Sequence, residues 1–311
     1  MAHRIASLLS AATEMLFALG LGDRVVAVSH ECDWPPEANR LPRVTISHIA
    51  AAASSTAIDT QVRKLASSGK PLYGLDVDLL GQLAPDLIVT QQQCDVCAVS
   101  YTDVLAAVAN DPRLAGCRVV ALNPRGLGDV LADLRRVGEA AGAPDAAEQC
   151  IAALEARIEA VRQRTAMLAA SERPRFVCIE WCEPLMLAAN WVPEIVELAG
   201  GQNGLSIGGR HSTYHAWPDV LTYDPEVIVV SPCGFDLSRT LEEAHSLAKN
   251  VPGWATMAAV RTGRVYAVDG NAYLNRSGPR LIDSLEILAH LLHPNLFAAP
   301  PHAAAGWQRL A

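Results

Sequence analysis

The sequence has few of the features that mark membrane proteins or nucleic-acid-binding proteins. No stretch of its 311 residues approaches the roughly 18 uninterrupted apolar positions that a membrane helix needs. It has 25 Lys and Arg against 33 Asp and Glu, a formal net charge of −8, and no run of basic residues. We therefore expect no membrane insertion and no nucleic-acid partner.

Cysteines and leader signals are also scarce. Eight cysteines are too few for a disulfide scaffold in a chain of this length. Residues 5–21 are largely apolar, as in a signal peptide, but Ser10, Thr13 and Glu14 interrupt them and no cleavage site follows. We expect reduced thiols and a cytoplasmic protein, or a periplasmic one if the natural precursor carries a signal absent here.

Common enzyme motifs are missing. The sequence has no G-x-S-x-G, no Walker loop and no H-E-x-x-H, and the glycine-rich segment 200–204 follows a helical pattern instead of opening one. Glu180 and Glu183 flank Trp181 and would act as acid and base only if buried, whereas hydrogen bonding to a ligand is the simpler role. We expect a binding protein without catalytic residues.

Short β-branched runs alternate with segments of helical periodicity, which predicts βαβ units and parallel sheets. In the first half we expect strands at 4–9, 24–29, 86–90 and 118–122, and helices at 13–19, 101–110 and 127–141. In the second half we expect strands at 175–181, 226–231 and 264–268, and helices at 192–199, 237–248 and 280–292.

Between these halves the periodicity changes. From Pro144 to about Ser171, apolar residues at 3/4 spacing predict one long amphipathic helix. About 26 residues at ~1.5 Å each would span about 39 Å, which is long enough to connect two lobes. In both 83–90 and 223–230, a proline and an acidic residue directly precede an apolar strand, so the two halves of the sequence resemble each other. The predicted fold is α/β, with similar parallel-sheet lobes at 1–142 and 173–311 joined by a helix at 143–172.

Parallel sheets place ligand-binding residues at the carboxyl ends of their strands, so two facing lobes would enclose a ligand cleft. The loops expected to line this cleft are residues 10–14, 30–36, 72–74, 91–100, 181–191, 208–217 and 269–280.

Four segments carry a resemblance to a known family. They are residues 5–14 with 19–26, C-D-W-P-P-E at 32–37, residues 83–88, and R-S-G-P-R at 276–280 followed by His293-Pro294. In this order they are similar to the substrate-binding proteins of ABC importers that have a single connecting helix, and among these to the cobalamin (vitamin B12) binders. The resemblance spans essentially the whole chain and implies cobalamin or a related corrinoid as the bound ligand.

The resemblance also implies docking on a permease through one exposed Glu on each lobe. This sequence has Asp78 at the first such position, and the second falls near Pro218-Asp219. The departure argues against an ABC permease as partner, and we interpret the chain as a cytoplasmic relative of the importer components.

A broad apolar macrocycle needs flat faces to pack against and polar partners for the amides at its rim. Aromatic residues make up only 5% of the chain, yet several fall in the expected cleft loops. The resemblance matches Trp181, Gln91 and Arg276 to cleft positions of cobalamin binders. The expected ligand-binding residues are Ser10, Ala12, Thr13, Glu31, Trp34, Tyr73, Gln91, Trp181, Glu183, Trp191, Tyr214, Trp217, Asn271 and Arg276. For Trp34, plugging the lobe beneath a turn is an equal alternative.

Thiols and imidazoles fall in the same loops and can hold a thiophilic metal or reach the axial face of a cobalt or iron macrocycle. The candidate metal ligands are Cys32, Cys94, Cys97, Cys182, His211 and His215. Cys94 and Cys97 form a C-x-x-C, which can be a metal clip, a redox pair or two packed residues. Buried or cleft-lining thiols are the simpler alternative.

Two alternatives to corrinoid binding follow. Haem and iron-siderophore binders share the scaffold, so haem, an iron chelate or a metal ion held by the Cys and His residues is the second hypothesis. A chelatase-like or corrinoid-processing enzyme is the third, because two-lobed α/β chelatases share this general plan.

Overall fold

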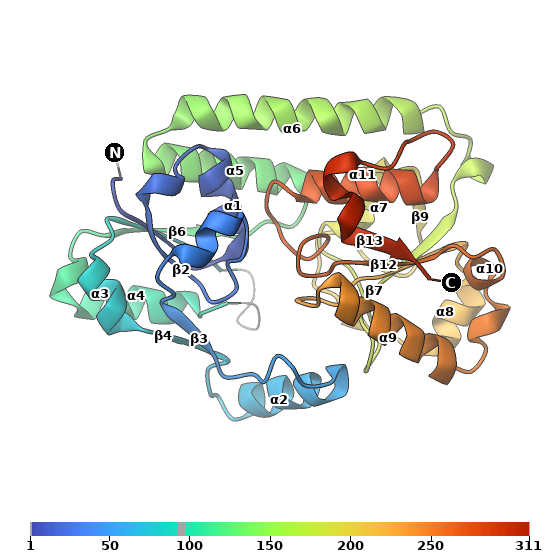
Figure 1. Cartoon of the computed structure of the whole chain (residues 1–311), viewed down its shortest axis with the longest axis horizontal. Helices are drawn as coiled ribbons and strands as arrows, with labels where there is room; N and C mark the ends of the chain where they lie inside the picture. Colours follow the sequence, from blue (N-terminus) through green and yellow to red (C-terminus); the bar gives the residue numbers. More distant parts are fainter. Residues whose placement is uncertain (1, 93–97, 311) are drawn as a thin grey trace. The chain divides into compact units, whose positions relative to one another are not determined.

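The computed structural model describes residues 2–92 and 98–310, and the chain divides into two units (Figure 1). The first unit comprises Met1–Pro124 and Gly128–Ala153, and the second comprises Arg125–Leu127 and Leu154–Ala311. Helix α6 (Pro144–Thr165) begins in the first unit and ends in the second.

The first unit is built on a parallel sheet with strand order β2-β1-β5-β6. Its strands are β1 (Ile5–Ser7), β2 (Val25–Val28), β5 (Leu87–Gln91) and β6 (Arg118–Leu122). Its helices include α1 (Ser10–Ala18), α3 (Val77–Leu83), α4 (Tyr101–Asn110) and α5 (Leu127–Ala141). Ala6 and Ile88 on the strands pack with Leu80 on α3 and Val104 on α4, and all four are fully buried.

A second, smaller sheet projects from the first unit. It contains β3 (Thr45–Ser47) and β4 (Tyr73–Leu75), which pair antiparallel and are connected through α2 (Ser55–Ser67). The Ser54 hydroxyl caps α2 by accepting the Ala57 N–H. This segment leaves the main sheet after β2 and returns before α3.

The second unit contains a larger, mixed sheet with strand order β10-β8-β7-β11-β12-β13, and β9 also pairs with β7. Strands β7 (Arg175–Trp181), β11 (Val227–Val230) and β12 (Val265–Val268) are parallel. The shorter strands are β8 (Met186–Leu187), β9 (Gln202–Asn203), β10 (Thr213–Tyr214) and β13 (Trp307–Arg309). Of these, β8, β10 and β13 pair antiparallel with their neighbours.

Helices cover both faces of this second sheet (Figure 1). On one face lie α7 (Val192–Leu198) and α11 (Leu281–Leu292), and on the other lie α8 (Trp217–Tyr223) and α9 (Leu237–Asn250). A short helix, α10 (Ala258–Arg261), precedes β12. Burial of Val177, Ile228 and Ala244 joins strands β7 and β11 to α9 in one core.

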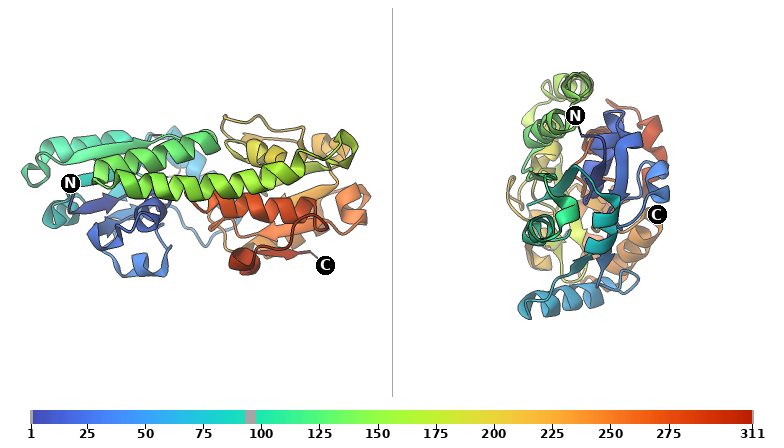
Figure 2. Two further views of the ribbon diagram at one scale, coloured as in Figure 1. Left: turned by 90° about the horizontal axis from the view of Figure 1, so that it is seen from above. Right: turned by 90° about the vertical axis from the view of Figure 1, so that its left-hand side faces the viewer.

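Helices α5 and α6 run alongside each other in the first unit (Figure 2). Their contact needs a small residue, because a Cβ placed on Gly138 of α5 would lie 2.5 Å from the Cβ of Ala147 on α6. On the exposed side of the same pair, the Arg135 guanidinium donates to the Glu148 carboxylate at 3.0 Å. The close backbone approach therefore fixes how the connecting helix begins.

The two sheets repeat the same turn before an inner strand. Helices α3 and α8 both end in a non-glycine residue of left-handed conformation, Ala84 with φ 42° and Asp224 with φ 49°. A proline follows each, Pro85 and Pro225, and then β5 or β11. The proline stops the helix because it has no N–H to donate.

An arginine fixes each of these turns: Arg4 lies directly before β1, and Arg175 is the first residue of β7. Arg4 donates from its guanidinium to the Leu83 carbonyl at 2.6 and 2.9 Å, and Arg175 donates to the Asp224 carbonyl at 2.7 and 2.9 Å. The carboxylate after each proline accepts a backbone N–H from the same arginine, at 3.1 Å for Asp86 and 3.0 Å for Glu226. The repeat seen in the sequence is therefore also a repeat of hydrogen bonds.

The two-lobed α/β plan is confirmed, and four local expectations are corrected. Residues 10–14 belong to α1 instead of a loop, because the N–H of Thr13 already donates to the Leu9 carbonyl. Residues 73 and 74 lie in β4. The second sheet is mixed instead of parallel. Helix α6 ends at Thr165, short of Ser171, where the Thr165 hydroxyl bonds the Leu198 carbonyl.

Candidate functional site

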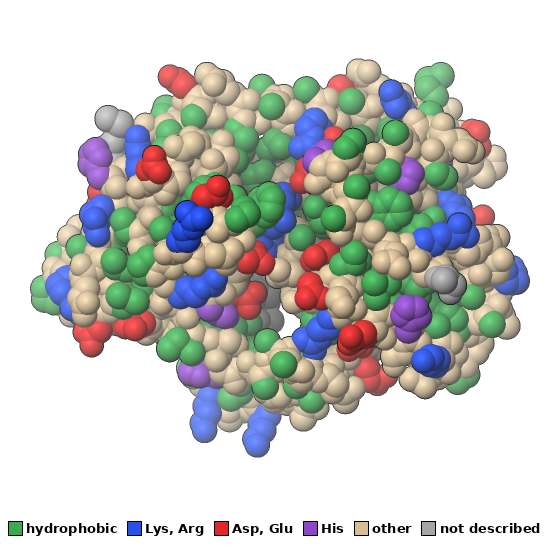
Figure 3. All heavy atoms as spheres, in the orientation of Figure 1, with side chains coloured by type: hydrophobic (Ala, Val, Ile, Leu, Met, Phe, Trp, Pro, Cys, Tyr) green, Lys and Arg blue, Asp and Glu red, His purple; other side chains and the backbone are tan. Residues whose placement is uncertain are grey.

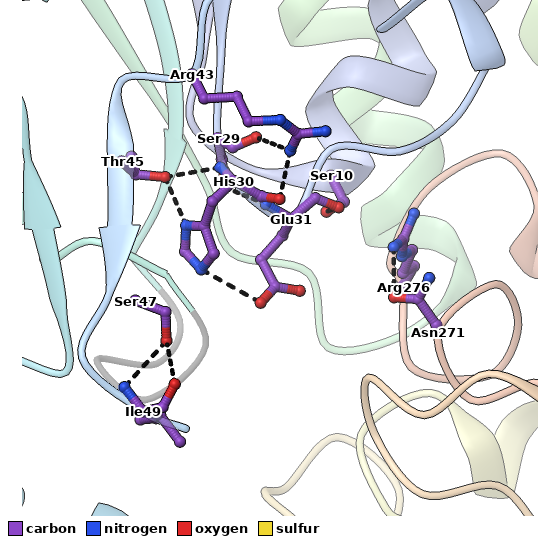
Figure 4. A network of polar contacts seen from close by, with 10 residues as sticks. All are labelled: Ser10, Ser29, His30, Glu31, Arg43, Thr45, Ser47, Ile49, Asn271 and Arg276. Atoms are coloured by element: carbon purple, nitrogen blue, oxygen red, sulfur yellow. Dashed lines mark hydrogen bonds and ion pairs between the residues drawn. The ribbon is translucent and has the colours of Figure 1, made fainter. Parts of the chain in front are cut away.

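His30 is the second residue after β2, and residues of the small sheet hold its imidazole (Figure 4). The hydroxyl of Thr45 lies 2.7 Å from Nδ1 and also accepts the backbone N–H of His30 at 2.9 Å. The ring of Tyr73 packs against the imidazole, with centroids 5.2 Å apart. The Glu31 carboxylate lies 3.3 Å from Nε2, which is buried. His30 is therefore held through Nδ1 by Thr45, and the Glu31 carboxylate covers Nε2, so the imidazole is not open to a metal ion.

The backbone around His30 is fixed by Arg43 and Ser10. The Arg43 guanidinium donates to the carbonyl oxygens of Ser29 and His30. The Ser10 hydroxyl donates to the Glu31 carbonyl at 2.9 Å, so the start of α1 is tied to the loop after β2. The Glu31 side chain is 43% exposed at this carboxyl edge of the sheet.

Three expected site residues lie inside the first unit. Ala12, Thr13 and Cys32 are fully buried. The Thr13 hydroxyl donates to the Cys32 sulfur at 3.0 Å and shares a hydrogen bond of 2.7 Å with Ser7. These contacts tie α1 to β1 and to the loop after β2, so the three residues support the carboxyl edge from beneath.

The remaining expected residues of the first unit differ in exposure. Gln91 is the last residue of β5 and is buried. Trp34 is 45% exposed, which contradicts the alternative that its side chain fills the lobe beneath a turn. Cys94 and Cys97 lie outside the described residues.

On the second sheet, a stack of side chains forms at the end of β7. The rings of Trp181 and Phe235 meet edge-on, with centroids 5.2 Å apart. The guanidinium carbon of Arg239 lies 3.4 Å from the centroid of the same Phe235 ring, within range of cation–π attraction. Phe235 is buried between these partners, whereas Trp181 remains partly exposed. The stack therefore presents one indole at the carboxyl edge.

Two polar residues lie beside this stack. The backbone N–H of Asn271 donates to the Phe235 carbonyl at 3.0 Å. The Arg276 guanidinium donates to the Asn271 side-chain oxygen at 2.7 Å, which gives the pair a fixed geometry (Figure 4). The Asp269 carboxylate accepts the N–H groups of Asn271 and Ala272 at 2.9 and 2.8 Å and so shapes the turn that carries them.

The loops after β11 and β12 are joined by backbone contacts. The Asn275 side chain donates to the Ser231 carbonyl at 3.0 Å, and the Gly234 N–H donates to the Gly270 carbonyl at 3.3 Å. A Cβ on Gly270 would lie 2.0 Å from the Pro232 carbonyl oxygen, so only glycine allows this approach. The Asn271 and Arg276 side chains therefore stand on a preformed support.

Glu180, on β7 next to Trp181, has an unusual ionisation. Burial raises the pKa of its carboxyl group to about 7, although the Ser212 hydroxyl opposes the shift by donating to Oε2 at 2.7 Å. The same hydroxyl accepts the Ala189 N–H at 3.0 Å. Glu180 can therefore donate or accept a hydrogen bond near neutral pH.

The other expected ligand residues of the second unit have separate surroundings. Trp191 is buried, and its indole N–H donates to the Leu274 carbonyl at 2.6 Å. Trp217 packs against Trp254 with ring centroids 5.8 Å apart. Glu183 is exposed and Tyr214 is 51% exposed.

The expected metal candidates of the second unit are not brought together as a metal-binding group within residues 2–92 and 98–310. Burial raises the pKa of Cys182 well above its usual range, and the nearby carboxylates of Glu243 and Glu183 add to the shift. Cys182 is therefore held as a thiol and not as the thiolate that metals prefer. His211 is exposed, and His215 Nε2 lies 3.1 Å from the Thr213 hydroxyl.

A different group in the described part of the chain has metal-ligand spacing. One donor atom each from Asp283, Glu286 and His302 lies within 4.8 Å of the others. The guanidinium of Arg157 already bonds both carboxylates, at 2.6 Å to Asp283 and at 2.8 and 2.9 Å to Glu286. An internal cation therefore fills the position that a metal ion would take.

Sequence reasoning missed Phe235, Arg239, Arg43 and Thr45. The signal for Phe235 was position, because this aromatic residue lies in the loop after β11, a place where parallel sheets present ligand contacts. Arg43 and Thr45 belong to a segment whose periodicity predicted no element.

Comparisons with known proteins cover nearly the whole chain. The family model described as periplasmic binding protein matches residues 5–272. A vitamin B12-binding protein of Vibrio cholerae is 25% identical over 289 residues, covering 92% of this chain and 87% of that protein. An uncharacterised ABC transporter substrate-binding lipoprotein of Bacillus subtilis is 24% identical over 300 residues, covering 94% of this chain and 81% of that protein.

Solved structures show the same fold. The periplasmic vitamin B12 binding protein of Vibrio cholerae has a TM-score of 0.66 at 23% identity and covers 94% of this chain and 97% of that one. A periplasmic heme binding protein from Pseudomonas aeruginosa has a TM-score of 0.71 at 20% identity, covering 95% and 94%.

No helix within the described ranges has both the length and the apolar character needed to cross a bilayer. Charged side chains of both signs are interspersed on the face drawn in Figure 3. The family match over residues 5–272 and the shared fold confirm the resemblance seen in the sequence. The chain belongs to the periplasmic binding protein family.

Proposed function

We propose that this chain is a non-catalytic, ABC-importer-type substrate-binding protein whose ligand is cobalamin or a related corrinoid. The observation that carries the proposal is the carboxyl edge of the second sheet, where the Trp181–Phe235–Arg239 stack adjoins the Asn271–Arg276 pair. An indole at the edge offers a flat apolar face, and the neighbouring amide and guanidinium offer hydrogen bonds to carbonyl groups.

A corrinoid suits this chemistry because its ring is broad and apolar while its rim carries amides. Amides need both donors and acceptors, and the second edge supplies both through the Asn271 amide and the Arg276 guanidinium. The relatives named as vitamin B12-binding proteins support the same ligand class. On the first unit, Trp34 is a separate candidate contact because its side chain is 45% exposed, whereas Gln91 is buried.

Haem is the second candidate ligand. Structures of heme-binding proteins are as similar in fold as the vitamin B12 binder, and one of them holds two hemes. Haem would need an axial ligand for its iron and cationic partners for its carboxylates. Arg239 and Arg276 could be the partners of the carboxylates. The covering of His30 Nε2 by Glu31 disfavours His30 as that axial ligand.

The test is a titration of the purified protein with cyanocobalamin, cobinamide and haemin, followed by calorimetry and thermal unfolding. We expect saturable corrinoid binding, and at 100 times Kd a stabilisation of about 2.7 kcal/mol. Trp181→Ala and Arg276→Ala should each weaken binding about 10-fold or more, because each removes a contact at the centre of the edge.

The matched control is Trp254→Phe, which changes a buried tryptophan in the core of the same unit. It should lower thermal stability and leave the corrinoid Kd unchanged. Haemin binding without corrinoid binding would replace the first ligand with the second, and turnover of cobalamin would contradict the non-catalytic role.

The cytoplasmic location predicted from the sequence remains a proposal. Fractionation of cells that express the natural gene at its own level tests it. Recovery with a periplasmic or lipid-anchored marker would contradict it.

A further inference from the structure

The loop that carries Asn271 and Arg276 contains a residue in an unfavourable backbone conformation. Leu274 has φ 65°, in the left-handed region that favours glycine, and its side chain is buried. A non-glycine residue stays in this conformation only where its surroundings hold it. Leu274 lies two residues before Arg276, so its backbone sets the direction in which the chain approaches that side chain.

Two side chains hold the peptide groups of Leu274. The buried indole of Trp191, at the start of α7, donates its N–H to the Leu274 carbonyl at 2.6 Å. The buried hydroxyl of Ser284, on α11, accepts the Leu274 N–H at 3.0 Å and donates to the Arg280 carbonyl. Both backbone polar groups of Leu274 are therefore paired with side chains and not with a neighbouring strand.

We propose that Trp191 and Ser284 are positioning residues that hold Leu274 in its left-handed conformation and thereby place Arg276 for ligand binding. The inference rests on the proposed function, because Arg276 and Asn271 are its assumed ligand contacts. It also gives Trp191 a role other than direct contact with the ligand, since the indole is buried and its only donor is already used.

The hydrogen bond to the Leu274 carbonyl explains why position 191 needs an indole. Phenylalanine would fill most of the same volume but has no N–H, so Trp191→Phe would leave the Leu274 carbonyl buried without its donor. With the carbonyl released, Leu274 can relax toward ordinary negative φ. That change would rotate the following peptide units and move Arg276 away from Asn271.

The experiment compares Trp191→Phe, Ser284→Ala and Arg276→Ala by cyanocobalamin calorimetry. We expect Trp191→Phe and Ser284→Ala each to weaken binding about 5-fold, the size of one lost buried hydrogen bond. In the Arg276→Ala background, Trp191→Phe should weaken binding less than about 2-fold, because its effect passes through Arg276. Independent, additive losses would overturn the inference.

Hydrogen exchange measured on the unliganded proteins separates positioning from general destabilisation. Amides of residues 269–280 should exchange at least about 10-fold faster in Trp191→Phe, while those of β7 and β11 keep their wild-type rates. The matched Trp254→Phe variant should leave both the loop exchange and the Kd unchanged. Unchanged loop exchange in Trp191→Phe would overturn the inference, as would an equal loss of affinity in Trp254→Phe.

A rescue gives a second readout. Glycine adopts positive φ without strain, so Leu274→Gly should reduce the penalty of Trp191→Phe on binding, measured relative to Leu274→Gly alone. If Arg276→Ala binds cyanocobalamin like the wild type, the proposed ligand contact fails, and the exchange result still decides whether Trp191 holds the loop.

Discussion

At the scale of a single residue, Glu180 couples the stability of the second unit to pH. Burial raises its pKa to about 7, so between about pH 5 and 7 the folded chain keeps a proton that the unfolded chain releases. Stability should therefore fall as pH rises through this window. In Glu180→Gln the fall should be absent, which makes the variant more stable than wild type at pH 8 by on the order of 1 kcal/mol, because the ionised Glu180 carboxylate is poorly solvated in the folded chain.

Urea unfolding at pH 5 and pH 8 measures this difference. Glu183→Gln is the matched control, because Glu183 is an exposed carboxylate in the loop that follows β7. Parallel pH profiles for wild type and Glu180→Gln would contradict the assignment of a buried, protonated carboxyl group.

Gly270 is a second residue whose effect is local and large. Any side chain there meets the backbone carbonyl of Pro232 at 2.0 Å, and backbone cannot rotate away as a side chain can. Gly270→Ala should destabilise the protein by about 2 kcal/mol or more. Gly128→Ala, where the Cβ meets nothing within 4 Å in the first turn of α5, should instead be neutral or stabilising. Thermal unfolding of both variants tests the contrast, and equal effects would contradict it.

At the scale of elements, Arg157 joins α6 to α11. Its guanidinium lies between Asp283 and Glu286, and His302 Nε2 is 3.1 Å from the Glu286 carboxylate. Arg157→Met should cost about 2 kcal/mol at pH 7, because it leaves two partly buried carboxylates facing each other. The penalty should shrink at high salt, which screens the repulsion between the two carboxylates.

Denaturant unfolding at low and at high salt checks both the penalty and its salt dependence. Arg135→Met is the control, because the Arg135–Glu148 pair is exposed and should change stability little. A salt-independent penalty for Arg157→Met would point to lost packing instead of lost charge pairing.

The elements that the sequence predicted well are those with their own apolar periodicity. Residues Leu127, Val130, Leu134, Val137 and Ala141 are all buried at 3/4 spacing, and the expected helix matches α5 at both ends. Strands β8, β10 and β13 contain two or three residues, which is too short for a period to show. The α1 start was missed because Ser10 and Thr13 read as loop residues, although their hydroxyls are paired inside the unit.

At the scale of the whole molecule, each unit has a core of its own. Ile88 on β5 and Ile228 on β11 are fully buried at equivalent positions of the repeat. Ile88→Ala and Ile228→Ala should each cost about 3 kcal/mol. Hydrogen exchange should show the loss of protection mainly in the unit that carries the change. Loss of protection across the entire chain in both variants would instead show a single cooperative unit.

The candidate site was less predictable than the fold. The ends of the strands could be predicted from periodicity, and Trp181, Asn271 and Arg276 became candidate ligand contacts because they lie at or after those ends. Which side chains fill the core and which reach the edge depends on packing between segments far apart in sequence. Trp191 illustrates this, because its use as a donor to Leu274 follows from an approach between residues 83 positions apart.

The segment of the small sheet has a consequence for how this protein can vary. Its two ends meet, since the Asp76 N–H donates to the Val44 carbonyl at 2.9 Å, and the parallel sheet of the first unit is complete without it. Residues 45–75 are therefore a module that evolution or an engineer can lengthen, exchange or replace with a short turn while β1, β2, β5 and β6 keep their pairing. Thr45 and Tyr73 are the exceptions, because they alone of this module hold His30 in the contacts described. A graft that keeps these two side chains would change the surface of the first unit and leave its carboxyl edge intact.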